Sequence, residues 1–324
     1  MLKTPKFWTQ KSLISLMLLP LSALYFVGFM IAKMTSRPQK ISKPIICVGN
    51  IIAGGSGKTP TAIALGKILN QMGVKFAYLS RGYMNDGSKF LMLQKHDNLK
   101  AEQTGDEPLL LLETAPTFVA KDRVFGAKQI ESMTQFEAIV LDDGMQSNKI
   151  VRDYTIMVVD GKIGFGNGLL IPAGPMRETV SQGLRKADLI VTIGEENHEL
   201  SKRFLGKKVV NGQIKITNFE IFREKKLIAF CGLAYPQKFF DLIKKSDLEL
   251  IEELSFADHH RYKIDQLNSL LKTAEQKNAQ LVTTKKDWVK FPKKYQQKIP
   301  YLDIELRFDN EILLKNELAK IIKN

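Results

Sequence analysis

Residues 47–60 read Cys-Val-Gly-Asn-Ile-Ile-Ala-Gly-Gly-Ser-Gly-Lys-Thr-Pro, and this stretch decides the fold of the chain around it. A short apolar run at 44–48, bounded by proline and glycine, is typical of a buried strand. Apolar residues at 61–69 recur at helical spacing. Strand, glycine-rich loop and helix in this order indicate a phosphate-binding loop. We therefore expect an α/β fold like that of the P-loop NTPases, with a mostly parallel sheet.

The loop itself supplies groups that bind a nucleotide phosphate. Its glycines let backbone N–H groups close around phosphate oxygens, and the following helix presents its positive N-terminal end. Lys58 can reach the outer phosphates, and the Thr59 hydroxyl can ligate Mg²⁺. Ile52 stands where a first glycine is usual, and Ala53 stands where partitioning ATPases carry a further lysine. The expected nucleotide-binding residues are Gly54, Gly55, Ser56, Gly57, Lys58, Thr59 and Pro60.

A second apolar run, at 138–141, ends in two aspartates and a glycine. An apolar strand that ends in acidic residues places a carboxylate beside the magnesium ion of a phosphate loop. We therefore expect Thr59, Asp142 and Asp143 to hold Mg²⁺, with ATP and Mg²⁺ as the cofactors.

The length of 324 residues is about right for two domains. Since 44% of the residues are hydrophobic and 25% are charged, the composition is that of an ordinary folded protein. Cys47 and Cys231 lie in separate apolar runs, which argues against a disulfide and fits a reducing compartment. The net charge of +14 favours anionic partners such as lipid or a phosphorylated substrate. The basic residues are dispersed, without a stripe interleaved with aromatics, so nucleic acid is not an expected partner. No feature of the sequence indicates a protein partner.

An uncharged apolar segment at 12–32 precedes the phosphate loop. As a helix it would be about 31 Å long, close to the hydrocarbon thickness of a bilayer. Pro20 is a residue at which such a helix can kink. Basic residues within 33–43 place the rest of the chain on the cytoplasmic side. We expect a membrane anchor that spans the bilayer or lies in its interface. The alternatives are a cleaved signal peptide and a buried core helix.

Strands and helices alternate from the phosphate loop to the C-terminus. Changes in this pattern along the chain suggest the domain boundaries. We expect the N-terminal anchor helix and its basic flank at 1–40 and a phosphate-loop domain at 41–205. A connector of short β-like runs at 206–226 would lead to a second, smaller α/β domain at 227–324.

Six short motifs follow one another along the chain: Gly49-Asn50 with residues 54–60, Ser-Arg-Gly-Tyr at 80–83, Thr-Gly-Asp-Glu-Pro at 104–108, Asp-Asp-Gly-Met-Gln at 142–146, Gly-Asn-Gly at 166–168 with Pro-Ala-Gly-Pro at 172–175, and Asp-His-His at 258–260. Their order and spacing resemble the tetraacyldisaccharide 4′-kinases, the membrane-bound lipid A kinases of Gram-negative bacteria. The resemblance covers nearly the whole chain. Ser147 and Leu169 stand where the family usually has histidine and arginine.

The resemblance implies a lipid kinase that acts in lipid A biosynthesis at the bacterial inner membrane, with its catalytic domains on the cytoplasmic face. The γ-phosphate of ATP would pass to the 4′-hydroxyl of a tetraacylated glucosamine disaccharide 1-phosphate, and inner-membrane lipids would be a further partner. Asp106 would be the catalytic base, oriented across the domain cleft by His259 rather than His260, and Lys58 would contact the phosphates. The residues implied at the sugar-phosphate headgroup are Tyr83, Glu107, Arg123, Gln146, Asn167 and Arg177.

Two other functions fit parts of the sequence. Residues 284–287, Thr-Lys-Lys-Asp, match the guanine-reading pattern of GTPases, but Leu141 stands where the GTPase Asp-x-x-Gly turn needs aspartate. A membrane-associated regulatory ATPase of the partitioning type would need its signature lysine at position 53. Such an ATPase has no need of a lipid-facing helix together with Asp106 and His259, and the guanine motif of a GTPase would lie in the second domain.

Overall fold

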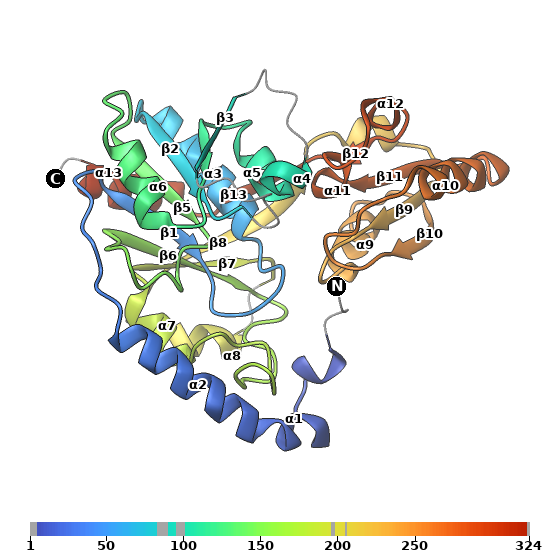
Figure 1. Cartoon of the computed structure of the whole chain (residues 1–324). Coiled ribbons are helices and arrows are strands. Elements are labelled where there is room, and N and C mark those ends of the chain that lie inside the picture. The colour runs from blue at the N-terminus through green and yellow to red at the C-terminus, as the bar shows by residue number, and fades with distance from the viewer. Residues whose placement is uncertain (1–4, 83–89, 95–100, 196–197, 205, 323–324) are drawn as a thin grey trace.

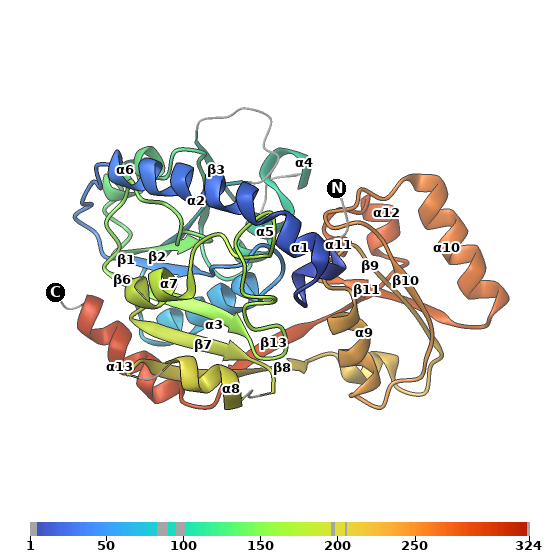
Figure 2. The ribbon, with the colours of Figure 1, turned by 90° about the horizontal axis from the view of Figure 1, so that it is seen from below.

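The structure is a computed structural model that describes residues 5–82, 90–94, 101–195, 198–204 and 206–322 (Figure 1). In this part of the chain, nine strands form one sheet and four strands form another. We call the first sheet with its helices the large unit, and the second sheet with its helices the small unit. The two units lie side by side in both views (Figures 1 and 2). The fold is therefore mixed α/β with a large, mostly parallel sheet, as the alternation of strands and helices predicts.

The large sheet has the strand order β13-β8-β7-β6-β1-β5-β2-β4-β3. β3 and β13 run antiparallel to their neighbours, and the other neighbouring strands pair in parallel. β1 lies between β5 and β6, and Val48 in β1 is paired with Asp142 in β5. The phosphate loop and the two aspartates therefore leave the same edge of the sheet. The strands are β1 Ile45–Gly49, β2 Phe76–Ser80, β3 Leu91–Leu93, β4 Thr117–Val119, β5 Ala138–Asp142, β6 Tyr154–Asp160, β7 Leu189–Ile193, β8 Lys208–Ile216 and β13 Ile304–Phe308.

Helices cover both faces of the large sheet, because its central strands are buried on both sides. One apolar core joins the sheet to α3 (Lys58–Gln71), α5 (Asp106–Leu111) and α13 (Glu311–Ile322). The other core joins it to α6 (Arg123–Glu131), α7 (Val180–Lys186), α8 (His198–Ser201) and the 3₁₀ turn η2 (Lys202–Phe204). The short helix α4 (Ala101–Thr104) precedes α5.

The small unit is a parallel sheet with helices on both faces. Its strand order is β10-β9-β11-β12. α9 (Gln237–Lys244) packs on one face, while α10 (Ile264–Gln276) and α12 (Lys293–Gln296) pack on the other. α11 (Lys285–Trp288) follows β11, and the 3₁₀ turn η3 (Phe219–Phe222) leads into β9. The strands are β9 Leu227–Cys231, β10 Leu250–Ser255, β11 Gln280–Thr284 and β12 Tyr301–Leu302.

The C-terminal segment returns to the large unit, which differs from the expected division of the chain. The strand expected near 301–306 is two strands in two sheets, with β12 in the small sheet and β13 beside β8 in the large one. The expected connector at 206–226 contains β8, whose Val210 is buried in the large core together with Leu306. This pairing was missed because β8 carries lysines on its exposed positions and its partner lies about 90 residues further along the chain.

The apolar N-terminal segment forms two helices, not the single helix expected over 12–32. α1 (Leu13–Met17) and α2 (Leu19–Met34) follow η1 (Lys6–Trp8), and Pro20 lies in the first turn of α2, where its missing N–H breaks the helical ladder. α2 lies along the outside of the large unit beside α7 (Figures 1 and 2). Of the helices that the structure describes, none has both the length and the apolar content needed to cross a bilayer.

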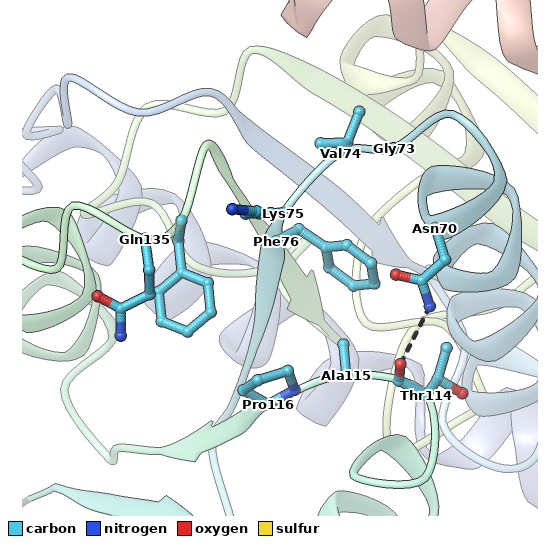
Figure 3. A pocket seen from close by; sticks show the side chains of 10 residues that line it. Asn70, Gly73, Val74, Lys75, Phe76, Thr114, Ala115, Pro116 and Gln135 are labelled. Atoms are coloured by element: carbon cyan, nitrogen blue, oxygen red, sulfur yellow. Dashed lines mark hydrogen bonds between the residues drawn. The ribbon is translucent and has the colours of Figure 1, made fainter.

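A hollow of about 370 Å³ lies at the opposite edge of the large sheet from the phosphate loop (Figure 3). Its lining includes Val74, Ala115 and Phe136, which immediately precede or flank the amino ends of β2, β4 and β5. Asn70 donates a hydrogen bond to the Thr114 carbonyl at its rim (3.1 Å). Ligands of open α/β sheets bind at the carboxyl ends of the strands, so this hollow is not the candidate site.

The packing of α13 on the large unit can be tested by mutation. Leu318 is fully buried, whereas Ile312 in the same helix is 73% exposed. Leu318→Ala should lower the free energy of unfolding by about 2–5 kcal/mol because it leaves a cavity in the core. The matched Ile312→Ala variant should change it by no more than about 0.5 kcal/mol. Urea denaturation measures both, and equal effects would contradict the observed packing.

Candidate active site

The phosphate loop connects β1 to α3 and has the backbone shape that its glycines predict. Gly54 and Gly57 have φ angles of 109° and 89°, which side chains rarely tolerate. A Cβ at Gly54 would also lie 2.8 Å from Tyr235. Asn50 donates from Nδ2 to Ser56 Oγ (2.6 Å) and accepts from Lys58 Nζ at Oδ1 (3.3 Å). This buried asparagine therefore shapes the loop, although its motif gave no role for it in advance.

Asp143 lies directly beside the phosphate loop. Its carboxylate oxygens are 3.7 Å from Lys58 Nζ and 3.1 Å from Arg177 Nη1. Burial by itself raises the pKa of Asp143, but the charges of Lys58 and Arg177 outweigh it and lower the pKa to about 2. The aspartate is thus ionised and links two cations that could each contact phosphate.

Asp142, the last residue of β5, differs from Asp143 because its pKa is raised rather than lowered. Its Oδ1 atom is buried and has no hydrogen-bond partner among the described residues. Burial first, and then the charges of Glu107 and Asp143, raise the pKa of Asp142. An unpartnered buried carboxylate oxygen beside a phosphate loop fits a cation ligand, because a bound cation would supply both the missing partner and the missing charge.

The expected magnesium ligands are therefore consistent with the structure. Thr59 is the second residue of α3, Asp142 is the last residue of β5, and Asp143 follows it. Within the described residues, no group of three or more His, Cys, Asp or Glu side chains could hold a metal by itself. Mg²⁺ commonly takes only one or two carboxylates and completes its shell with water and substrate phosphates.

Asp106 and His259 come from different units and meet at the interface between them. Asp106 begins α5 of the large unit, and His259 lies in the loop after β10 of the small unit. His259 Nδ1 is 2.9 Å from Asp106 Oδ2. Burial raises the pKa of Asp106, but the hydrogen bond from His259 and the charge of Lys286 outweigh it and lower the pKa to about 2. His259 has a φ of 55°, an uncommon backbone conformation of the kind that occurs at functional sites.

The neighbouring His260 has a different environment. Its ring stacks on Phe256 with centroids 4.8 Å apart and meets the edge of Tyr262 at 4.7 Å. Its Nε2 atom is 3.2 Å from Gln266 Oε1. His260 is thus part of the packing of the small unit, which agrees with the preference for His259.

Glu107 and Lys286 lie at the same interface, in the contact between α5 and α11. Lys286 Nζ is 3.4 Å from Glu107 Oε1 and 3.4 Å from His259 Nε2. Glu107 also acts on Asp142 electrostatically, which connects the Asp106–His259 pair to the expected magnesium site. Lys286 was not predicted as a site residue. The only sequence signal was its place in the Thr-Lys-Lys-Asp motif, which indicated a guanine site instead.

Arg177 reaches the same region from the loop between β6 and α7, and Gln146 reaches it from the loop between β5 and β6. The backbone of Arg177 and its neighbours fixes the first of these loops. This loop is held against the phosphate-loop segment by two backbone hydrogen bonds, from Ala53 N to Pro175 O (2.7 Å) and from Arg177 N to Ile51 O (2.7 Å). Arg177 Nη1 donates to Gln146 Oε1 at 3.1 Å. The backbone thereby aims the Arg177 guanidinium at the aspartates.

Arg123 and Asn167 are placed differently from the expectation that they face a substrate headgroup. Arg123 donates to the backbone carbonyls of Asp142 (3.2 Å) and Asp143 (2.7 Å), so it holds the end of β5. Asn167 is buried and donates to the carbonyls of Phe7 and Ala173, so the structure does not bring it to the interface of the units. Tyr83 lies outside the described residues.

The small unit also contacts the phosphate loop itself. Lys238 in α9 donates to the Gly55 carbonyl (2.7 Å) and pairs with Asp160 at the end of β6 (2.6 Å). These contacts were not foreseen, because nothing local in sequence marks a lysine on a short helix as a partner of a loop about 180 residues earlier.

The interface of the two units and the adjoining phosphate loop therefore bring together a glycine-rich loop, two carboxylates that could hold a cation, a carboxylate–imidazole pair and an arginine. A phosphoryl transfer to a hydroxyl group requires these parts: a phosphate cradle, cations for the developing charge and a base near the attacking oxygen.

Comparison with known proteins gives one family. A family profile described as "Tetraacyldisaccharide-1-P 4'-kinase" matches residues 14–323. Proteins named tetraacyldisaccharide 4'-kinase from Paramagnetospirillum magneticum and Methylorubrum extorquens are 37% and 34% identical, over 97% and 98% of this chain and the same shares of their own. A crystal structure of "apo" form LpxK from Aquifex aeolicus in complex with ATP has a TM-score of 0.76 and 26% identity. It matches 96% of this chain and 100% of that one.

The raised pKa of Asp142 makes cation binding depend on pH. A carboxylate must be ionised to hold Mg²⁺, so protons compete with the metal below the raised pKa. The affinity for Mg²⁺ in the presence of ATP should fall about tenfold or more from about pH 8 to about pH 6, as measured by calorimetric titration. The Asp142→Asn variant corrects for the titration of ATP itself. A wild-type dependence no steeper than that of this variant would contradict the assignment.

Proposed function

The chain belongs to the tetraacyldisaccharide-1-P 4'-kinase family. We propose that phosphate is transferred at the interface of its two units by the residues described above. The protein is an ATP-dependent kinase that phosphorylates the 4′-hydroxyl of the tetraacylated disaccharide 1-phosphate of lipid A biosynthesis. One observation supports the assignment of its catalytic residues most directly. The Asp106 carboxylate is held 2.9 Å from the His259 imidazole, and the charge of the next residue, Glu107, acts on Asp142.

Asp106 acts as the base in this proposal. The 4′-hydroxyl oxygen attacks the γ-phosphorus of ATP, the bond between that phosphorus and the bridging oxygen of ADP breaks, and the hydroxyl proton passes to Asp106. The lowered pKa of Asp106 keeps the carboxylate ionised at neutral pH. A weakly basic carboxylate suits a loose transition state, in which the attacking oxygen gives up its proton late.

The phosphate loop binds the triphosphate, with Lys58 on the outer phosphates and the backbone of 54–59 around the others. Thr59, Asp142 and Asp143 would hold Mg²⁺, which when bound neutralises charge on the β- and γ-phosphates. Arg177 is fixed by its contact with Asp143, so its guanidinium can contact phosphate without a large loss of side-chain freedom. Glu107, which pairs with Lys286, and Gln146, which accepts from Arg177, are assigned to the acceptor headgroup.

The guanine-binding alternative is not favoured by the environment of residues 284–287. The guanine base would need a free carboxylate at Asp287, yet this side chain is fully buried and accepts hydrogen bonds from Gly232 N (2.9 Å) and Thr284 Oγ1 (2.8 Å). It also pairs with Lys290 at 2.6 Å. Asp287 thus joins the start of α11 to β9 and has a structural role.

Substitutions at the pair test the assignment of the base. Asp106→Asn and His259→Asn should each lower kcat by at least about 100-fold, the range typical of lost general-base catalysis. The matched control His260→Asn, in the next residue, should change kcat far less. Transfer of labelled phosphate from ATP to the disaccharide lipid in detergent measures all three. Turnover within threefold of wild type for Asp106→Asn or His259→Asn would remove that residue from this role.

We further propose that α1 and α2 dock on the surface of an anionic bilayer, which at the inner membrane would bring the candidate active site to its lipid acceptor. The outer side of these helices exposes a run of large apolar side chains: Leu13, Ile14, Leu16, Met17, Leu19, Leu21, Leu24, Val27, Ile31 and Met34. The inner side is fixed to the large unit, since Ser22 Oγ donates to the Leu170 carbonyl (2.8 Å) and Tyr25 OH to the Arg177 carbonyl (2.9 Å). The net charge of +14 adds attraction to anionic lipid.

Vesicle binding tests this docking surface. Leu13 and Met17 are 74% and 73% exposed in α1, and each can bury its side chain in the interface. The double variant Leu13→Ser with Met17→Ser should bind vesicles of anionic phospholipid at least about tenfold more weakly in a sedimentation assay. Ile312→Ser, an equally exposed residue of α13, is the matched control and should bind as wild type. Unchanged binding of the double variant would contradict the proposal.

A further inference from the structure

Lys286 lies at the back of the Asp106–His259 pair, where three of its neighbours converge on one ammonium group. Its Nζ atom is 3.4 Å from His259 Nε2, 3.4 Å from Glu107 Oε1 and 3.9 Å from Asp106 Oδ2. The side chain is largely buried in the contact between α11 and α5. A lysine ammonium donates hydrogen bonds and accepts none. It therefore restricts which nitrogen of His259 can carry a proton.

We propose that Lys286 is a positioning residue that fixes His259 in its Nδ1–H tautomer and thereby maintains Asp106 as an ionised, correctly oriented base. With the ammonium facing it, Nε2 of His259 must present its lone pair, so the single imidazole proton lies on Nδ1 and points at Asp106 Oδ2. The inference rests on the proposed role of the Asp106–His259 pair and adds the group that sets its protonation state.

The surrounding charges show why this restraint is needed. Asp258 Oδ2 lies 3.9 Å from His259 Nε2, so a proton on Nε2 would find an acceptor if Lys286 were absent. Glu107 faces the ammonium from α5. Asp287 in α11 pairs with Lys290, two residues beyond the end of the helix, at 2.6 Å. Lys286 is thus the cation that decides between the two tautomers.

Lys286 is held in its charged form by the same neighbours. Burial alone would lower the pKa of Lys286, but the carboxylates of Glu107, Asp106, Asp258 and Asp287 outweigh burial and raise it. The ammonium is therefore a fixed positive charge over the whole working pH range, and it contributes to the low pKa of Asp106.

The preceding residue provides a matched control. Lys285 belongs to the same short helix but points away from the pair, with its Nζ atom 2.5 Å from Glu113 and 3.5 Å from Asp303. Substitution of either lysine removes one positive charge from α11, so an effect of net charge alone would be the same for both.

The first experiment is the pH profile of kcat with ATP and the disaccharide lipid. Lys286→Met should lower kcat about tenfold or more near pH 7, because His259 can then place its proton on Nε2 and no longer orients Asp106. With Mg²⁺ saturating at every pH, so that Asp142 does not set the acidic limb, that limb should move about one pH unit or more upward because the pair binds a proton more readily without the cation. KM for ATP should stay within about twofold. Lys286→Arg should restore the limb, and Lys285→Met should match wild type. An acidic limb of Lys286→Met that coincides with wild type would overturn the inference.

The second experiment does not depend on a variant that retains activity. ¹⁵N resonances of the imidazoles in wild-type protein report the tautomer of each of the four histidines, and loss of one set in His259→Asn assigns His259. A neutral Nδ1–H form is expected, and an Nε2–H form would overturn the inference. If Asp106→Asn retained full turnover while the tautomer were as expected, the assignment of the base would fail but the restraint by Lys286 would stand.

Discussion

The contact between the Asp106 carboxylate and the His259 imidazole is the interaction on which the catalytic arrangement depends. It joins two units whose sheets share no strand, and each unit supplies only half of what phosphoryl transfer requires. The large unit holds the phosphate loop and the aspartates, and the small unit holds the imidazole and Lys286. The relative placement of the units therefore sets the geometry of Asp106, the proposed base. Lys238, which donates to the Gly55 carbonyl, fixes the same placement on the other side of the phosphate loop.

A continuous series of polar contacts connects the apolar N-terminal helices to the phosphate loop. Tyr25 in α2 donates to the Arg177 carbonyl, Arg177 pairs with Asp143, Asp143 lies beside Lys58, and Lys58 donates to Asn50. The residues that would meet the bilayer and those that would bind phosphate are thus parts of one packed assembly. An enzyme whose acceptor keeps its acyl chains in the membrane requires such a connection, because the headgroup must arrive in a defined orientation at the active site.

The features that could be predicted from the sequence are those that depend on residues close together in the chain. The phosphate loop, the strand that ends in Asp142 and most helices follow from short-range spacing, and the family resemblance paired Asp106 with His259 across about 150 residues. The misplaced features depend on distant partners. The strand β13 returns to β8 in the large sheet, and Asn167 uses its amide to hold the N-terminal segment. The proposed role of Lys286 could not be predicted because its carboxylate partners, Asp106 and Glu107, come from the other unit.

A double-mutant cycle on turnover tests most directly whether Asp106 and His259 act together as one catalytic pair at the interface of the units. If they do, the Asp106→Asn/His259→Asn double variant should be no slower than the slower single variant, within about threefold, because either change alone already disables the pair. Thermal unfolding of all four proteins shows whether the units remain folded together. Effects on kcat that multiply, so that the double variant loses the product of the two single losses, would contradict the account.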